Sequence, residues 1–167
     1  MLPRATTDRN EESPRPKFDK TNFKDKQIIV KHFMPQFTSQ SLARLKTCDH
    51  QIQMVFNEVI KERACIVICG ARTLAEQQAA FKGGFSKLDG INKKSKHQVS
   101  KEQPLSRAID CLPAKSVNGK LTLDWNDAKG HTDFANLVLK KAAELNVNLV
   151  WGGDWKTFKD RPHYELV

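Results

Sequence analysis

Two histidines and two aspartates in the C-terminal half of this 167-residue chain have the residue types of a metal-dependent hydrolytic centre: His97, Asp110, Asp160 and His163. A catalytic zinc ion needs three nitrogen or oxygen ligands from the protein, a fourth position open to water and a general base nearby. Asp160 lies three residues before His163, across a turn that contains Pro162, so its carboxylate could face the open position without being a ligand. These residues could therefore supply three ligands and one base.

Five short motifs follow one another between Ser39 and Val167. In chain order they are Gly70-Ala71-Arg72-Thr73, Ser95-Lys96-His97, Ala108-Ile109-Asp110, Trp151-Gly152-Gly153-Asp154-Trp155 and Asp160-x-x-His163-x-Glu165-Leu166. Their types and order resemble the zinc peptidases that include phage L-alanyl-D-glutamate endopeptidases and VanY-like D-alanyl-D-alanine carboxypeptidases. Because five ordered motifs agree, the resemblance is specific.

The resembled family binds its metal through the His and Asp of a Ser-x-His-x-x-Gly-x-Ala-x-Asp pattern and through a later His, three places after the catalytic acidic residue. The resemblance therefore implies that His97, Asp110 and His163 bind one zinc ion and that Asp160 is the general base. Zinc is favoured because two imidazoles, one carboxylate and an open position suit it, although other divalent ions can occupy such a site. Asp160 would take a proton from the attacking water and pass it to the leaving amine.

The chain departs from the family pattern in the loop between the first two expected ligands. The segment 98–105 lengthens the gap between His97 and Asp110, and Ser106 stands where the family has Gly. The departure removes no ligand. We expect the geometry of this loop, and with it the preference for substrate, to differ from that of the relatives.

Arg72, Asp154 and Trp155 are the remaining candidate residues of the site. Arg72 lies at an expected strand-to-helix corner, where a guanidinium could bind a carboxylate or a developing oxyanion. The resemblance implies this role, whereas the residues alone also allow a surface arginine over a helix end. Asp154 and Trp155 either line the substrate groove, as the family's Gly-x-Asp-Trp motif implies, or form a turn with a core tryptophan. Glu165 is a candidate hydrogen-bond partner for the second ring nitrogen of a ligand histidine.

The remaining histidines and all the cysteines are expected to be structural. They are His32, His50 and His131, and Cys48, Cys65, Cys69 and Cys111. Cys65 and Cys69 are four residues apart in an expected strand, so their side chains would share a face. At roughly 13 Å of separation they are too far apart for a disulfide bond.

Hydrophobic periodicity and turn residues predict the elements that position the site. In chain order these are an amphipathic helix from Ser39 to about Arg63, a strand at 64–69, a short helix opened by a capping box at Thr73-Leu74-Ala75-Glu76 and ended by Gly83-Gly84, a strand at 107–112, a hairpin turn at Asn118-Gly119, a helix from residue 132 or 133 to 145, and strands at 147–151 and 163–167. Their sum is an α+β fold in which a small, mainly antiparallel sheet carries the zinc site and helices pack against it. This is similar to hedgehog-like and D-Ala-D-Ala-peptidase-like domains.

The strand that contains Asp110 places this carboxylate among apolar neighbours. Side chains alternate along a strand, so Ala108, Asp110 and Leu112 face one side of the sheet and Ile109 and Cys111 the other. A lone buried carboxylate is costly unless it is paired or bound to a metal. A metal ion would remove that cost.

Length and composition indicate a single folded domain. With 39% apolar residues the chain can bury one core, and the polar residues 1–37 are expected to form a basic, partly irregular arm before a peptidase domain at 38–167. No stretch approaches the roughly 18 apolar residues of a membrane span, and the N-terminus lacks the apolar core of a secretory signal. We therefore expect a protein that is made in the host cytoplasm and acts on the cell wall after release.

The net charge of +9 and the pI of about 9.5 favour an anionic partner. Cell-wall polymers and stem-peptide carboxylates are anionic; nucleic acid is the rival, but the chain lacks the interleaved aromatic and basic residues of a base-stacking surface. We expect a monomeric, phage endolysin-type L-alanyl-D-glutamate endopeptidase that acts on the peptidoglycan stem peptide. A D-alanyl-D-alanine carboxypeptidase and a non-catalytic zinc-binding module on this scaffold are the alternatives, because the metal machinery alone does not specify the bond.

Overall fold

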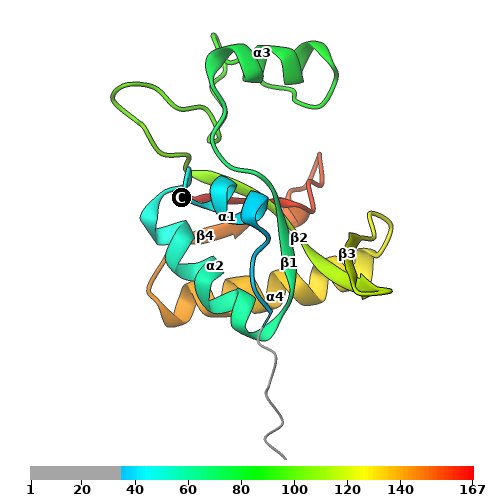
Figure 1. Cartoon of the computed structure of the whole chain (residues 1–167). Coiled ribbons are helices and arrows are strands. Elements are labelled where there is room, and N and C mark those ends of the chain that lie inside the picture. Colours follow the sequence, from blue (N-terminus) through cyan, green and yellow to red (C-terminus); the bar gives the residue numbers. More distant parts are fainter. Residues whose placement is uncertain (1–34) are drawn as a thin grey trace, which may run out of the picture. The chain divides into compact units, whose positions relative to one another are not determined.

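Both helices and strands form within residues 35–167, the part of the chain that this computed structural model describes (Figure 1). In chain order the elements are α1 (Ser39–Leu45), α2 (His50–Glu62), β1 (Cys65–Cys69), α3 (Leu74–Lys82), β2 (Ala108–Val117), β3 (Lys120–Leu123), α4 (Ala128–Glu144), β4 (Leu149–Trp151), the 3-10 helix η2 (Gly152–Asp154) and β5 (His163–Leu166). The expected arm at 1–37 lies outside the described residues except for its last three, and His32 lies outside them too. Among the described residues, no helix is long and apolar enough to cross a membrane.

The sheet is antiparallel throughout, with the strand order β1-β2-β5-β4, and β3 pairs with β2. The last strand of the chain thus lies inside the sheet rather than at its edge. As a result His163, the first residue of β5, pairs directly with Asp110 of β2. The expected α+β fold with a small antiparallel sheet is confirmed.

Two local sequence signals produce the structures expected of them. The β2–β3 hairpin turns at Asn118 and Gly119, whose φ angles of 50° and 76° lie in the left-handed region that this turn requires. Thr73 and Glu76 form the expected capping box at the start of α3, each side chain accepting from the other residue's backbone N–H. Both predictions are therefore confirmed.

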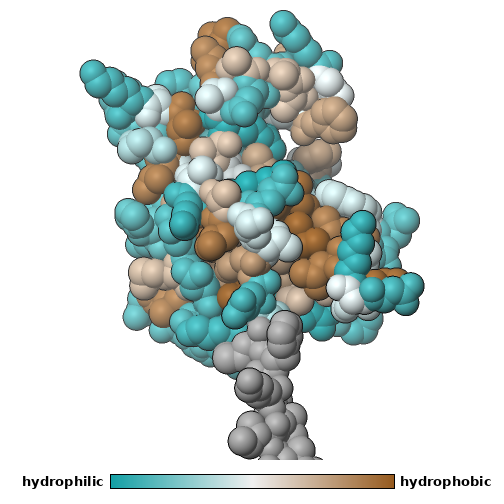
Figure 2. Space-filling model, viewed as in Figure 1, coloured by the Kyte–Doolittle hydropathy of each residue, from teal (hydrophilic) through white to brown (hydrophobic). Residues whose placement is uncertain are grey.

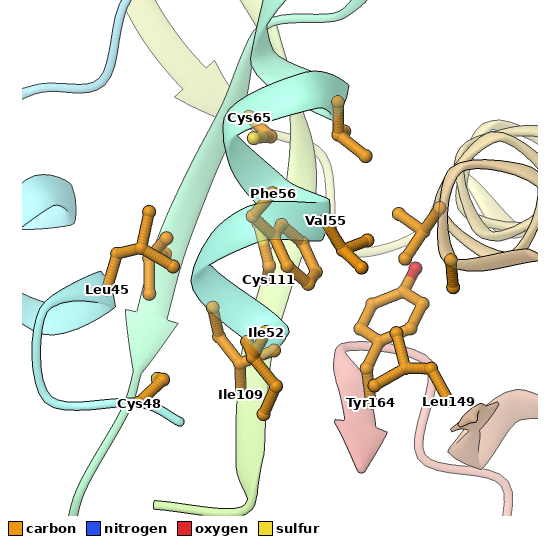
Figure 3. Packing of buried hydrophobic residues seen from close by; sticks show 14 of the residues in the cluster. Leu45, Cys48, Ile52, Val55, Phe56, Cys65, Ile109, Cys111, Leu149 and Tyr164 are labelled. Carbon is orange, nitrogen blue, oxygen red and sulfur yellow. The ribbon is translucent and has the colours of Figure 1, made fainter. Parts of the chain in front are cut away.

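The core lies between the sheet and the helices α2 and α4, and Tyr164 of β5 is one of its buried residues (Figure 3). The Tyr164 ring meets Phe56 of α2 and Phe134 of α4 edge-on, with ring centroids 5.6 and 6.3 Å apart. Because side chains alternate along a strand, His163 points away from these helices. Core residues and site residues therefore follow one another along the same strand.

The single helix expected over 39–63 is wrong, because the chain forms two helices, α1 and α2. Asp49 caps the second helix by accepting a hydrogen bond from the backbone N–H of Gln51. The backbone of Ser106 holds the break: its N–H donates to the carbonyl oxygen of Thr47, and its carbonyl oxygen accepts from the N–H of Asp49. The apolar periodicity continues across the break, so periodicity alone did not reveal it.

The second main helix, α4, begins at Ala128, earlier than the expected residue 132 or 133. Asp127 is its N-cap and accepts a hydrogen bond from the backbone N–H of Gly130 at 2.8 Å. A Cβ atom at Gly130 would overlap the Asp127 carboxylate. The glycine, which disfavours a helix by propensity, is required here by the cap.

A bulge at the end of β1 changes the face on which Cys69 lies. Cys65 pairs with Pro113, and regular spacing from there would set Cys69 opposite Ile109. Instead Cys69 pairs with Asp110, and residues paired directly across a sheet project to the same face. The expectation that Cys65 and Cys69 share a face is therefore wrong. All four cysteines are free in this structure.

Candidate metal centre

Three donor atoms from three separate segments meet on the face of the sheet that points away from α2 and α4. His97 Nε2 and His163 Nδ1 each lie 3.1 Å from Asp110 Oδ1, and they lie 3.2 Å from each other. The three side chains are largely buried. The structure thus brings together the three residues that the sequence suggested as ligands.

The sheet and one loop position these donors. Asp110 and His163 are paired across β2 and β5, so their side chains stand side by side. His97 comes from the loop between α3 and β2, and its carbonyl oxygen accepts a hydrogen bond from the N–H of Arg72. The N–H of Val99 in turn donates to the carbonyl oxygen of Arg72. These two hydrogen bonds with Arg72 therefore fix the start of the lengthened segment 98–105.

Both histidine rings are oriented by a hydrogen bond at their second nitrogen. His97 Nδ1 lies 2.7 Å from the carbonyl oxygen of Gly70, and His163 Nε2 lies 3.0 Å from Oε2 of Glu165. These oxygens can only accept, so the two nitrogens donate. Once a metal displaces any proton from the other two ring nitrogens, these can offer lone pairs to it, as in metal-binding histidines. The hydrogen bond expected of Glu165 is confirmed.

The Asp110 carboxylate controls the pKa values around it. Burial by itself lowers the pKa of His97, but hydrogen bonds with Asp110 and Cys69 outweigh it and raise the value to about 10. Burial opposes the rise for His163 too, and hydrogen bonds with Asp110 and Glu165 raise its pKa. Burial would raise the pKa of Asp110, yet its bonds to the two histidines hold it well below the usual value. A divalent cation among the three donors would displace these protons.

The spacing of the donor atoms fits a tetrahedral zinc ion. At zinc–ligand distances of about 2.0–2.1 Å, two ligand atoms of a tetrahedron lie about 3.3 Å apart. The three distances measured here are 3.1 to 3.2 Å. Two nitrogens and one carboxylate oxygen leave a fourth position open, so the residues present fit the metal that the sequence suggested.

Asp160 lies on the turn before β5, partly buried near the three donors. Its N–H donates to the carbonyl oxygen of Gly152 at 3.0 Å, and its own carbonyl oxygen accepts from the N–H of His163 at 3.2 Å. Gly152 permits this approach, because a Cβ atom there would lie 2.6 Å from the Asp160 carbonyl oxygen. Burial, and next the charge of Asp110, raise the pKa of Asp160. A carboxyl group with a raised pKa can more readily take up and return a proton.

Arg72 lies at the corner between β1 and α3, and its guanidinium contacts the centre. Nη2 donates to Asp110 Oδ2 at 3.0 Å, and Nε donates to Cys69 Sγ at 3.2 Å. Asp110 is therefore shared: Oδ1 faces the histidines and Oδ2 faces Arg72. The ion pair holds the carboxylate in this orientation, while the Arg72 side chain remains 21% exposed.

Cys69 belongs to this centre, although the sequence analysis placed it among the structural cysteines. One ligand atom from each of Cys69, His97 and Asp110 lies within 4.8 Å of the others. The bulge of β1 brings the sulfur to this side. The position of Cys69 directly before the Gly70-Ala71-Arg72-Thr73 motif is the sequence signal that could have found it.

Trp155 and Asp154 differ in their relation to the donors. The Trp155 ring lies against the His163 ring, with centroids 5.1 Å apart. Asp154 is at the end of η2 and is exposed. Of the other described histidines, His50 is exposed, and His131 is buried in α4 with Nε2 hydrogen-bonded to the carbonyl oxygen of Asp124. Neither contributes to the centre.

Comparisons with known proteins identify relatives of the whole described region. A family model described as phage L-alanyl-D-glutamate peptidase matches residues 33–167. The peptidoglycan L-alanyl-D-glutamate endopeptidase CwlK of Bacillus subtilis (strain 168) is 30% identical over 105 residues, which are 61% of this chain. The match spans 60% of the length of that relative. The crystal structure of the Serratia marcescens L-Ala D-Glu endopeptidase ChiX has a similar fold, with a TM-score of 0.62 and 24% identity over 81% of this chain and 92% of that one.

Proposed function

The chain belongs to the phage L-alanyl-D-glutamate peptidase family, and on this basis we propose that it is a zinc-dependent peptidoglycan peptidase. The bond assigned to it is the one between L-alanine and D-glutamate in the stem peptide, which is an endolysin-type activity. The observation that carries the proposal is the triangle formed by His97, Asp110 and His163, in which each imidazole is oriented by a further hydrogen bond.

His97, Asp110 and His163 are the residues that would hold the zinc ion. The chemistry that bound zinc supplies is Lewis acidity, which polarises the scissile carbonyl and makes water nucleophilic at neutral pH. The chain contributes by fixing three ligands and leaving the fourth position free. Gly70 and Glu165 fix the two rings through their hydrogen bonds, and rings held in this way bind a metal without further reorganisation.

Asp160 is the general base in this proposal. It takes a proton from the attacking water and then returns that proton to the leaving amine of D-glutamate, so one carboxyl group serves as base and acid in turn. Its pKa, which burial and then Asp110 raise, supports the second step, because the protonated form is more populated than for an ordinary aspartate. Gly152 allows the turn that carries Asp160 to pack against η2.

Arg72 and Trp155 are proposed to meet the substrate. The exposed part of the Arg72 guanidinium binds an anionic group of the stem peptide or supports the developing oxyanion, while Nη2 remains on Asp110. Trp155 would contact the substrate beside His163, and the exposed residue Asp154 precedes it in the chain. These assignments place one substrate contact next to Asp110 and another next to His163.

The positive charge supports attraction to an anionic wall. The chain has a net charge of +9, and wall polymers and stem-peptide carboxylates are negative. In Figure 2, hydrophilic residues are spread over the face shown, around a central area of hydrophobic ones. The positive net charge supports attraction to the cell wall as a whole.

Mass spectrometry of muropeptides after digestion of purified peptidoglycan tests both the activity and the bond. We expect fragments that begin with D-glutamate, lost after treatment with a chelator and restored by zinc. His163→Ala should abolish the products, and His50→Ala, which changes an exposed histidine outside the centre, should not. Release of free D-alanine would instead identify a carboxypeptidase. A zinc-loaded protein that binds peptidoglycan without cleaving it would instead support the alternative of a non-catalytic zinc-binding module.

A further inference from the structure

Cys69 has no part in the mechanism above, yet its sulfur lies among the groups that would hold the metal. One ligand atom from each of Cys69, His97 and Asp110 lies within 4.8 Å of the others. These three residues form a second donor set, which shares His97 and Asp110 with the set that His163 completes. The chain thus offers two overlapping triads, one with nitrogen and oxygen donors and one that includes sulfur.

The pairing of β1 with β2 determines the position of Cys69. The bulge in β1 sets Cys69 opposite Asp110, so the thiol and the carboxylate project from neighbouring strands to the same face. Arg72 contacts both groups, with Nε on the sulfur at 3.2 Å and Nη2 on the carboxylate at 3.0 Å. One guanidinium therefore orients both donors.

The distances require only a small movement to close around a cation. With metal–sulfur and metal–nitrogen distances of about 2.3 and 2.05 Å, tetrahedral ligand atoms lie about 3.6 Å apart. Starting from separations of at most 4.8 Å, the side chains need to approach by at most about 1.2 Å. A change of this size is within the reach of a side chain such as Cys69.

Cys69 is more exposed than the other cysteines. Cys69 is half-buried, whereas the other three cysteines are fully buried. It lines a cavity of about 500 Å³ together with Gly70, Arg72 and, from α1, Arg44. Cys69 therefore borders open space on the α1 side, whereas the other cysteines lie in the interior.

We propose that Cys69 is a metal ligand of this chain, and that its thiolate, with His97 and Asp110, binds a thiophilic divalent cation without requiring His163. On binding, the metal–sulfur bond forms and the thiol proton is released to solvent. The thiolate and the carboxylate then balance the two positive charges of the cation, and soft metals are preferred because sulfur is a soft ligand. The inference rests on the proposed function only in that His97 and Asp110 bind metal.

Loading the full-length protein with Co²⁺ and with Cd²⁺ tests this assignment without any activity measurement. Sulfur ligation produces a near-ultraviolet charge-transfer band in the Co²⁺ spectrum. We expect the band in the wild type and in His163→Ala, and its loss in Cys69→Ala. Cys69→Ala should also weaken Cd²⁺ binding by about 10-fold or more. Cys65→Ala, at the other end of the same strand, is the matched control and should keep both properties; circular dichroism checks that each variant is folded.

The outcomes separate the two proposals. Bound Co²⁺ without the band, or a band that persists in folded Cys69→Ala, overturns the role of Cys69 and leaves the centre of His97, Asp110 and His163 intact. Failure of the wild type to bind Co²⁺, Cd²⁺ or zinc overturns both proposals. A band that requires His163 would show that sulfur joins the first triad rather than forming a second one, and would also contradict the inference.

Discussion

The two faces of the small sheet use the same strands for opposite purposes. On the face covered by α2 and α4, Tyr164 is fully buried against Phe56, and the burial of apolar surface stabilises the fold. On the other face, Asp110 and His163 bury groups that carry charge, and their desolvation is offset by pairing with each other, with Arg72 and Glu165, or with a metal. One step along β5, from His163 to Tyr164, separates the two functions. Stability and metal binding should therefore respond to different substitutions.

Asp160→Asn, next to the proposed metal ligands, should have the largest effect on activity. Asn has nearly the same size but cannot take up a proton, so we expect kcat for muropeptide release to fall by about 10²–10⁴-fold. Zinc content and the free energy of unfolding should stay close to those of the wild type, because Asp160 is not a proposed ligand. Asp133→Asn, an exposed change on α4 outside the centre, is the control. Wild-type activity in Asp160→Asn would refute the general base.

Phe56→Ala, on the core side, should show the reverse pattern. Removing this buried ring should lower the free energy of unfolding by about 3–5 kcal/mol, measured by urea denaturation. The zinc affinity of the folded protein should not change, since Phe56 contacts Tyr164 and none of the ligands. Met54→Ala on the same helix, where Met54 is 50% exposed, should cost less than about 0.5 kcal/mol. Equal losses for both variants would contradict the separation of the faces.

Glu165→Gln tests whether the hydrogen bond with Glu165 orients the ligand His163 on the metal-binding face of the sheet. The neutral amide should hold the His163 ring less firmly, and we expect zinc affinity to fall by about 10–100-fold in competition with a chelating dye. Stability without metal should change far less than in Phe56→Ala. Glu144→Gln, on the exposed side of α4, serves as the control. An unchanged zinc affinity would mean that the hydrogen bond from His163 to Glu165 does not contribute to zinc binding.

The pH dependence of zinc affinity tests the charge that the donor residues carry without metal. In the metal-free protein the pKa of His97 is about 10, because its hydrogen bonds with Asp110 and Cys69 outweigh the opposing effect of burial. His97 therefore carries an extra proton at pH 7, which zinc must displace. For each proton displaced, affinity should rise about tenfold per pH unit and should level off near the pKa of His97. Calorimetry in buffers of different ionisation enthalpy measures this proton release, and its absence would contradict the protonated state.

Features that depend on neighbouring residues followed from the sequence. Asn118 and Gly119 can adopt positive φ, so the hairpin followed from these two residues alone. The capping box at Thr73 and Glu76 also depends only on residues close together in the chain, and so does the alternation of side chains along the strand that contains Asp110. The motifs also supplied His97, Asp110 and His163 as candidates, and the structure brings these three together.

Features that depend on distant contacts did not follow from the sequence. The break between α1 and α2 is held by Ser106, which comes more than fifty residues after Asp49. The early start of α4 was missed because Gly130 disfavours a helix until its cap is considered. The face of Cys69 depends on a bulge, and a shift of one residue reverses every side chain beyond it.

The sequence by itself determined which side chains were available for chemistry and the period with which each strand presents them, because both are properties of the local backbone. Only the tertiary structure decided that Asp110 pairs with His163, that the loop delivers His97 to the same point, and that Cys69 joins them. Strand register and loop closure arise from contacts between residues far apart along the chain, where the burial of Tyr164 on one face fixes the positions of the ligands on the other.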